Sequence, residues 1–354
     1  MTALEQSPGP AESVPEAGPA RPDAPAAAVP AGAAAPATVP GSQTGAVLEK
    51  AAAENFPVAP FFLPARMRDG LMAVYGFARL VDDIGDGDLA DPAETARALG
   101  VAPAPDSPQA RLELLDAAEA DLDRVFAAAG SAGSAAVAGA SAPESADAEG
   151  PRHPLLRALV PAVRAHHLTD APFRALIEAN RVDQQVTRYA DYQALLDYCV
   201  LSANPVGRMV LELAGLATPE RVRQSDAICT ALQIAEHLQD VAEDRARGRI
   251  YLPAEDLARF GVAETDLDER TASGPLRDLV AFEVRRARAL LDEGAPLVGS
   301  MPGRLRVLLA GFAAGGRAAL DAIADAGYDV LAGAPKAGKG RLLRQAAVTL
   351  VRGR

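Results

Sequence analysis

The chain has 354 residues, 49% of them hydrophobic, and a formal net charge of −12 at pH 7. This length and apolar content suffice for a large core in one or two domains, and the acidic balance argues against a nucleic-acid-binding protein, which usually has a basic face. The two cysteines cannot form a disulfide framework, no apolar run approaches the ~18–20 residues of a membrane span, and the N-terminus lacks a signal-peptide pattern. We therefore expect a cytoplasmic protein, and peripheral attachment at the inner face of the membrane stays open.

Residues 1–45 are mostly Ala, Pro, Gly and Ser, a composition typical of a disordered tail. Residues 46–352 form one helical domain, because good helix formers dominate and apolar residues recur every three or four positions. A second Ala/Gly/Ser-rich stretch predicts a flexible loop at about 129–152. Alternating β-branched runs are nearly absent, so the fold class is all-α, a single large helical bundle. The predicted helices span residues 65–86, 108–128, 155–167, 171–187, 191–215, 219–247, 275–296, 303–327 and 339–351.

Carboxylates are concentrated in the helix predicted for 65–86. At about 100° per residue, Tyr75, Arg79, Asp82 and Asp86 fall on one stripe, and Asp83 lies beside it. The rest of this helix is apolar around most of its circumference, so the stripe is not part of a solvated face. Carboxylates at this density repel one another, and their burial is unfavourable unless a cation neutralises them. For one such motif alone, a solvated helix end is the alternative interpretation.

The same arrangement recurs within 231–253, where Gln233, Glu236, Asp240 and Asp244 share one stripe. Each of the two helices thus offers aspartates at positions i and i+4, roughly 6 Å apart on the helix surface. Two such helices that face each other across a bundle would enclose an acidic cavity. Mg²⁺ suits such a cavity because it takes one or two carboxylates and completes its shell with water and phosphate oxygens. The spacing therefore predicts Mg²⁺ ions that bridge the carboxylates to a diphosphate.

Three segments of the chain resemble the squalene/phytoene synthases, which process prenyl diphosphates. They are residues 75–86 (YGFARLVDDIGD), residues 197–211 (DYCVLSANPVGRMVL) and residues 232–253 (LQ…QDVAEDRARGRIYLP). Residues 327–330 (GYDV) are a weaker match. The resemblance covers essentially the whole globular part, and it implies the all-α isoprenoid (terpenoid) synthase fold with a central cavity.

The resemblance also implies roles for individual residues. Two or three Mg²⁺ ions and the substrate diphosphate would be bound by Asp82, Asp83, Asp86, Asp240 and Asp244. Tyr75 and Arg79 match positions that contact the diphosphate. The other polar residues expected to bind the substrate are Gln233, Glu236 and Arg249. The hydrophobic tunnel for the prenyl chains would be lined by Ser202, Ala203, Val206 and Gly207.

Within the family, residues 54–68 (ENFPVAPFFLPARMR), 187–192 and 202–208 are similar to bacterial hydroxysqualene synthases. The implied reaction converts presqualene diphosphate to hydroxysqualene and needs no NADPH. The resemblance implies that this protein is one of three enzymes that turn farnesyl diphosphate into squalene, often for hopanoids, so the other enzymes of the pathway are possible partners. Presqualene diphosphate synthase and phytoene synthase are alternatives within the family. A non-catalytic helical relative that binds metal or lipid is the alternative from another class.

Two positions depart from the family pattern. Glu236 stands where the family usually has Asn, which adds a negative charge beside the predicted metal site. Ala334 precedes Pro335 where an Arg is common, and Lys336 or Lys339 would replace that charge. Weaker site candidates are Arg188, Tyr189 and His237.

The C-terminus allows two interpretations. Residues 333–340 (GAPKAGKG) nearly spell a P-loop, but they lack the Ser or Thr that reaches Mg²⁺, so we expect a turn there. Residues 336–354 carry six Lys or Arg and no acid. They form either a last helix packed on the bundle or a basic patch that contacts an anionic membrane peripherally.

Overall fold

The computed structural model describes residues 59–138, 150–333 and 345. Over these residues the prediction of an all-α fold is confirmed, since they form helices and no strand beyond one isolated bridge. The predicted tail at 1–45, the predicted helix at 339–351 and most of the P-loop-like stretch lie outside the described residues.

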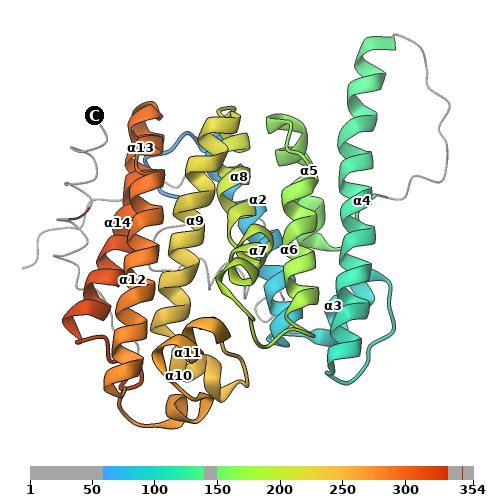
Figure 1. The fold of residues 1–354 in the computed structure, drawn as a ribbon. Helices are drawn as coiled ribbons and strands as arrows, with labels where there is room; N and C mark the ends of the chain where they lie inside the picture. Colours follow the sequence, from blue (N-terminus) through green and yellow to red (C-terminus); the bar gives the residue numbers. More distant parts are fainter. Residues whose placement is uncertain (1–58, 139–149, 334–344, 346–354) are drawn as a thin grey trace, which may run out of the picture. The chain divides into compact units, whose positions relative to one another are not determined.

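The helices follow one another in short steps along the chain (Figure 1). Their bounds are α2 Ala65–Asp86, α3 Pro92–Leu99, α4 Pro108–Ala138, α5 Pro154–His166, α6 Ala171–Val182, α7 Tyr192–Ser202, α8 Asn204–Leu213, α9 Pro219–Gln239, α10 Val241–Ala246, α11 Ala254–Phe260, the 3₁₀ helix η1 Glu264–Asp268, α12 Gly274–Gly294, α13 Pro296–Ser300 and α14 Gly303–Asp325.

Several helices begin with the same local device, a side chain that accepts a hydrogen bond from a backbone N–H of the first turn. Asp91, Thr218 and Ser273 do this for α3, α9 and α12, and each is followed by a proline in the first turn. Asp191 does the same for α7. These caps satisfy donors that have no partner inside the helix, and proline there loses no hydrogen bond.

The predicted bounds are confirmed for α2 and nearly so for α5 and α14, and others need correction. The predicted helix 191–215 is two helices, because Pro205 has no N–H to donate to the preceding turn. The predicted helix 219–247 breaks at Asp240, and 171–187 ends at Val182. The first part of the loop predicted at about 129–152 is helical, since α4 continues to Ala138, and residues 139–149 lie outside the described residues. The short elements α3, α11, α13 and η1 were not predicted.

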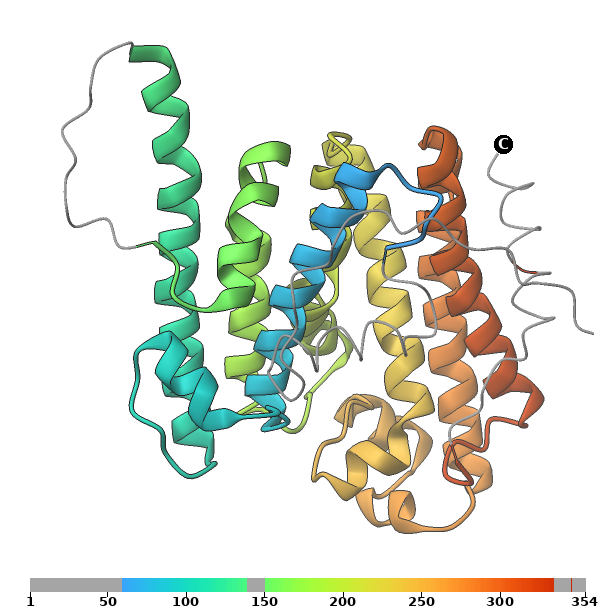
Figure 2. The ribbon, with the colours of Figure 1, turned by 180° about the vertical axis from the view of Figure 1, so that it is seen from behind.

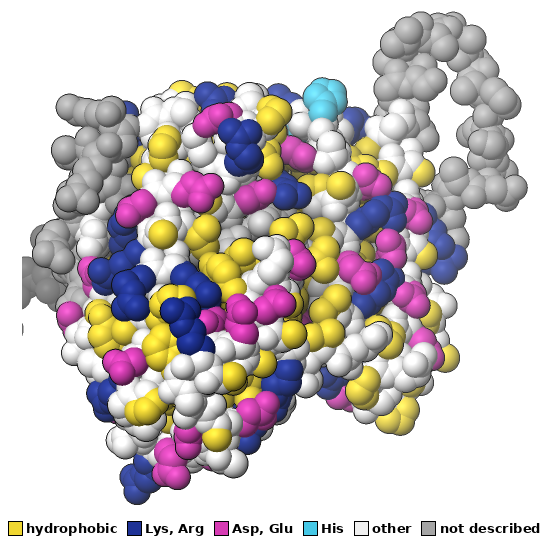
Figure 3. Space-filling view, viewed as in Figure 1, with side chains coloured by type: hydrophobic (Ala, Val, Ile, Leu, Met, Phe, Trp, Pro, Cys, Tyr) yellow, Lys and Arg dark blue, Asp and Glu magenta, His cyan; other side chains and the backbone are white. Residues whose placement is uncertain are grey.

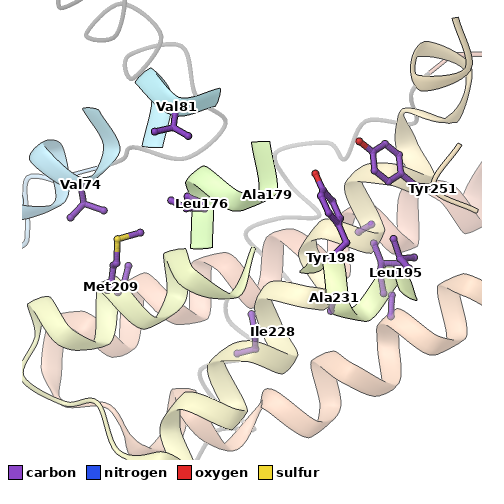
Figure 4. Close-up of a cluster of buried hydrophobic side chains, with 14 of the residues drawn as sticks. Val74, Val81, Leu176, Ala179, Leu195, Tyr198, Met209, Ile228, Ala231 and Tyr251 are labelled. Atoms are coloured by element: carbon purple, nitrogen blue, oxygen red, sulfur yellow. The ribbon is translucent and has the colours of Figure 1, made fainter. Parts of the chain in front are cut away.

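The bundle has two packing centres. α2 contacts α4, α5, α6 and α8, whereas α9 contacts α7, α8, α12, α13 and α14. The two ribbon views agree that α7 and α8 lie between these groups (Figures 1 and 2). Side chains from α2, α6, α7, α8 and α9 meet there in one buried apolar cluster, which includes Val74, Leu176, Met209 and Ile228 (Figure 4).

One described helix, α14, is long and apolar enough to cross a membrane by length and composition. The expectation that no stretch approaches such a length is therefore wrong for α14. Half of its apolar window is buried inside the protein, where it packs against α9, α12 and α13. A core helix of a folded protein has these same properties.

Candidate functional site

A polar cavity of about 300 Å³ opens where α2, α6, α7, α9 and α10 meet. The space-filling view shows one face of the molecule, on which acidic and basic side chains lie side by side (Figure 3). Most of the predicted polar site residues line this cavity, although they come from segments more than 150 positions apart in the sequence. Its lining comprises Arg79, Asp82, Asp86, Leu176, Ala179, Asn180, Asp183, Tyr198, Ser202, Gln233, Glu236, His237, Asp240, Asp244, Arg247, Arg249 and Tyr251.

The first acidic wall is the last turn and a half of α2. Asp82 is held by Asn180, whose Nδ2 donates to its Oδ1 at 3.3 Å and also to the carbonyl of Leu176. This approach requires a glycine at position 85, because a Cβ there would overlap the Asn180 side chain. Burial raises the pKa of Asp82 to about 6, against the lowering effects of Asn180 and Arg79. Burial thus disfavours the ionised carboxylate, and a neighbouring cation would stabilise it.

The second acidic wall crosses the break between α9 and α10. Asp240 has φ −105° and ψ 13°, so the predicted single stripe does not lie on one continuous helix. Nevertheless the Asp240 N–H donates to the Glu236 carbonyl at 3.0 Å, and the Asp244 N–H donates to the Asp240 carbonyl at 2.8 Å. Helical spacing therefore persists through the break, and all three carboxylates line the cavity. Burial, reinforced by Asp240, raises the pKa of Asp244 to about 7.

Arginines stand between the acidic walls. Nη1 of Arg249 lies 3.3 Å from Oδ1 of Asp86, which links the end of the second motif to the first. Arg79 forms a 3.1 Å ion pair with Asp83 one turn along α2. Arg247 also lines the cavity and pairs with Glu243 at 2.9 Å. These guanidinium groups place positive charge where a diphosphate would sit.

Asp83 differs from its neighbours. Its side chain is 1% exposed and it is not among the residues that line the cavity. The structure therefore places it behind Arg79, where it holds that guanidinium, and away from the position of a direct metal ligand that was predicted for it. The different placement of Asp82 and Asp83 follows from helix geometry, since adjacent residues on a helix point about 100° apart.

Aromatic rings form the remaining wall of the cavity. The rings of His237 and Tyr251 are stacked, with centroids 3.6 Å apart and planes at 9°. Tyr198 lies 5.9 Å from Tyr251, and both hydroxyl-bearing rings are visible together in Figure 4. Burial lowers the pKa of His237 to about 3, so this imidazole is neutral. The candidate Tyr189 packs behind the wall, 5.6 Å from Tyr251, and does not line the cavity.

Sequence reasoning missed Asp183, which follows the end of α6. Oδ2 of Asp183 accepts a hydrogen bond of 2.9 Å from the Tyr198 hydroxyl, and burial raises the pKa of this carboxyl to about 6. A signal was present, because Leu176, Ala179 or Asn180, and Asp183 recur at helical spacing and all line the cavity. Tyr198 and Tyr251 lay inside the segments that resembled the family, but no role had been given to them.

Two backbone hydrogen bonds to residues 187–189 hold the loop that contains Arg249 and Tyr251. The Ile250 N–H donates to the Thr187 carbonyl at 3.0 Å, and the Ala254 N–H donates to the Tyr189 carbonyl at 2.9 Å. The candidate Arg188 lies outside the cavity, where it pairs with Glu264 and donates to the Gly248 carbonyl. Arg188 therefore helps to hold the loop beside the cavity and does not line the cavity itself.

The predicted tunnel residues separate into two groups. Ser202 lines the cavity, whereas Ala203, Val206 and Gly207 do not. A Cβ at Gly207 would overlap side chains of Ser225 and Cys229, so this glycine allows α8 to approach α9. Val206 is 43% exposed.

Tyr75 is half-buried against the core one turn before Arg79 and is also outside the lining.

Comparison with known proteins agrees with this geometry. The model of the squalene/phytoene synthase family matches residues 50–346. A hydroxysqualene synthase of Rhodopseudomonas palustris is 34% identical over 247 residues, which cover 69% of this chain and 70% of that protein. A phytoene synthase of Mycobacterium tuberculosis is 30% identical over 255 residues, 71% of each.

A solved structure gives the same result for the fold. The crystal structure of squalene synthase HpnC from Alicyclobacillus acidocaldarius superposes with a TM-score of 0.63 at 38% identity, over 81% of this chain and 94% of that one. The isoprenoid synthase fold implied by the three resembling segments is thereby confirmed. The chain belongs to the squalene/phytoene synthase family.

Proposed function

We propose that this protein is a Mg²⁺-dependent synthase that converts presqualene diphosphate to hydroxysqualene. Members of its family process prenyl diphosphates, which sets the class of substrate. The observation that carries the proposal is the meeting of two aspartate pairs and three arginines, from segments more than 150 positions apart, in one cavity.

The carboxylates fit Mg²⁺ in a particular way. Among the described residues, no three or more His, Cys, Asp or Glu side chains are grouped so as to hold a metal ion by themselves. Mg²⁺ usually takes one or two carboxylates and uses substrate phosphate oxygens for much of its shell. Asp82 with Asp86, and Asp240 with Asp244, each supply such a partial set. Bound Mg²⁺ would supply Lewis acidity toward the diphosphate.

The protein's own residues then perform three tasks. Arg79 and Arg249 bind the diphosphate and stabilise the charge that grows on it as it leaves. Asn180 holds Asp82 in place through its hydrogen bond. The faces of Tyr198 and Tyr251 stabilise positive charge on the prenyl chain through their π electrons, and the apolar cluster below them excludes stray water.

The reaction is balanced without a reductant. The bond between the prenyl carbon and the diphosphate oxygen breaks, and its electron pair stays with the diphosphate. The resulting cyclopropylcarbinyl cation rearranges, and a water molecule donates a lone pair to form the new C–O bond. The proton that this water loses passes to the released diphosphate. The products are hydroxysqualene and diphosphate, so NADPH has no role in this proposal.

A second candidate activity is the head-to-head condensation of prenyl diphosphates, as in phytoene or presqualene diphosphate synthases. It is favoured by the 30% identity to a phytoene synthase, which is close to the value for the hydroxysqualene synthase. The hydroxysqualene reaction is preferred because two hydroxysqualene synthases match at 34% and 32% identity, against 30% for this phytoene synthase.

A product assay separates the candidates. Purified protein with Mg²⁺ and without NADPH would receive presqualene diphosphate or farnesyl diphosphate in separate reactions. We expect hydroxysqualene from presqualene diphosphate, and its loss in Asp82→Ala and Asp240→Ala. Asp278→Ala, an exposed position on α12, is the matched control and should retain activity. Presqualene diphosphate or phytoene as the product would replace the first proposal with the second.

A further inference from the structure

A second and larger cavity lies at the opposite end of α2 from the acidic site. Its volume is about 580 Å³, and its apolar lining includes Leu63, Met67, Leu213, Leu216 and Leu305. The walls are the start of α2, the end of α5, the end of α8 and the start of α14. Both ribbon views place the starts of α2 and α14 at the same end, with α10 toward the other (Figures 1 and 2).

Arginines surround this cavity in an unusual electrostatic setting. Arg66 donates to the Ala165 carbonyl, Arg68 to that of Leu63 at 2.9 Å, and Arg304 to that of Phe62 at 2.6 Å. Arg221 likewise donates to the carbonyls of Leu216 and Ser300. Within the described part of the chain, none of these four guanidinium groups has a carboxylate partner. Backbone carbonyls carry only partial charge, so this end keeps net positive charge although the whole protein is acidic.

Two carboxylates near this end offset part of that charge. Glu212, in the cavity lining, accepts hydrogen bonds from the backbone and hydroxyl of Thr169, at 3.0 and 2.7 Å. Asp69 is exposed one turn into α2. The arginines of other regions are different, because Arg174, Arg181 and Arg245 each pair with two or more carboxylates.

Apolar side chains project at the same end. Phe61 is 88% exposed, the largest value among the large hydrophobic residues that the structure describes, and its carbonyl accepts from Arg68. Val307, in the first turn and a half of α14 beyond Arg304, is 47% exposed. An anionic bilayer binds apolar groups in its acyl region and cations at its headgroups. This end of the molecule offers both, because an exposed aromatic residue lies next to arginines and an apolar cavity.

We propose that this end of the molecule, defined by Phe61, Arg66, Arg68, Arg304 and Val307, is a docking surface for an anionic lipid bilayer. The apolar cavity then opens toward the membrane. α2 joins it to the catalytic cavity, and Met67 and Arg79 are about 18 Å apart along the helix. In combination with the proposed function, docking gives prenyl substrates and products a lipid phase next to the enzyme. The proposal of a docking surface depends only on charge and exposure, so it is tested without a measurement of catalytic activity.

The test is co-sedimentation of the full chain with vesicles of phosphatidylcholine alone and of phosphatidylcholine with 30% phosphatidylglycerol. We expect binding to the anionic vesicles only, and its loss in 0.5 M KCl. Arg304→Glu and Phe61→Ser should each weaken binding at least about five-fold, since one basic residue near such a surface contributes roughly that factor. Both side chains are exposed, so the variants should fold, which their circular dichroism would verify.

Matched controls decide whether the surface is specific. Arg270→Glu changes an exposed arginine in the loop between η1 and α12, and Val200→Ser changes a 43% exposed residue on α7. Both should bind vesicles like the wild type. Equal losses in the controls, or no binding of the wild type, would overturn the proposal. Loss of binding in Lys336→Glu/Lys339→Glu, with Arg304→Glu unaffected, would instead assign membrane contact to the C-terminal basic segment. A failed product assay with intact vesicle binding would reject only the proposed function.

Discussion

The Tyr198 hydroxyl donates a 2.9 Å hydrogen bond to Oδ2 of Asp183 at the wall of the polar cavity. The two residues come from α7 and from the turn after α6, and neither belongs to an aspartate-rich motif. The bond fixes the Tyr198 ring beside Tyr251 and gives the buried carboxylate a donor. It also keeps negative charge close to, but separate from, the aspartate pairs.

Removal of the Tyr198 hydroxyl should therefore impair catalysis. We expect Tyr198→Phe to lower kcat/KM about 10- to 100-fold, the usual range for a hydrogen bond to a charged group. Asp183→Ala should have a similar effect, and the double variant should be little worse than either single one, because both remove the same interaction. Steady-state product formation measures this. Tyr189→Phe is the control, since that buried hydroxyl has no hydrogen-bond partner. Fully additive losses would contradict the coupling.

Gly85 is expected to be intolerant of substitution. A Cβ at Gly85 would overlap the Asn180 side chain, so Gly85→Ala should destabilise the protein by about 1–3 kcal/mol and displace the amide that holds Asp82. Gly311→Ala in α14 is the matched control, because no atom lies within 4 Å of its Cβ position. That change should stabilise the helix by about 0.5–1 kcal/mol. Urea unfolding measures both, and Asn180→Ala should partly rescue Gly85→Ala.

Glu283 makes stability depend on pH. Its side chain on α12 is buried against Arg286 and Asp256, and burial raises its pKa from 4.5 to about 7. The unfolded chain releases this proton at lower pH than the folded chain, so the contribution of Glu283 is most favourable below pH 4.5 and is lost as pH rises to about 7.

The corresponding measurement is urea unfolding at pH 5 and pH 7.5. Glu283→Gln mimics the protonated side chain, so its stability relative to the wild type should increase by about 1–3 kcal/mol between these pH values. Glu293→Gln, an exposed position on the same helix, should show no such change. A wild type and Glu283→Gln that respond identically to pH would refute this role for Glu283.

Glu236 should control metal affinity. It adds a third carboxylate to the wall that contains Asp240 and Asp244. We expect Glu236→Asn to weaken Mg²⁺ binding about 5- to 10-fold and to strengthen binding of inorganic diphosphate without metal, because the variant removes one negative charge from the cavity. Isothermal titration calorimetry with each ligand gives both numbers. Glu293→Gln, an exposed position on α12 outside the cavity lining, is the control. Unchanged Mg²⁺ affinity would show that Glu236 does not contribute to the metal site.

The sequence allowed much of the fold and about half of the cavity to be predicted. Asp82 and Asp86 were found because helical periodicity alone puts them on one stripe. Asp183 was missed because a single carboxylate after a helix has many ordinary explanations. The break at Asp240 was missed because the residues around it favour a helix equally well on both sides. Val206 and Gly207 do not line this cavity, because a resemblance identifies a segment but not the direction of each side chain.

The contact between Arg188 and Gly248 has a consequence for folding. These residues are 60 positions apart, and the segment between them contains α7, α8, α9 and α10. Closure of a chain loop of this length costs roughly 3–4 kcal/mol of entropy. The packing of those helices must therefore be largely complete before Arg249 and Tyr251 reach their places. The rim of the cavity consequently forms late when the protein folds, and its amide hydrogens should be among the first to exchange when the native state opens locally.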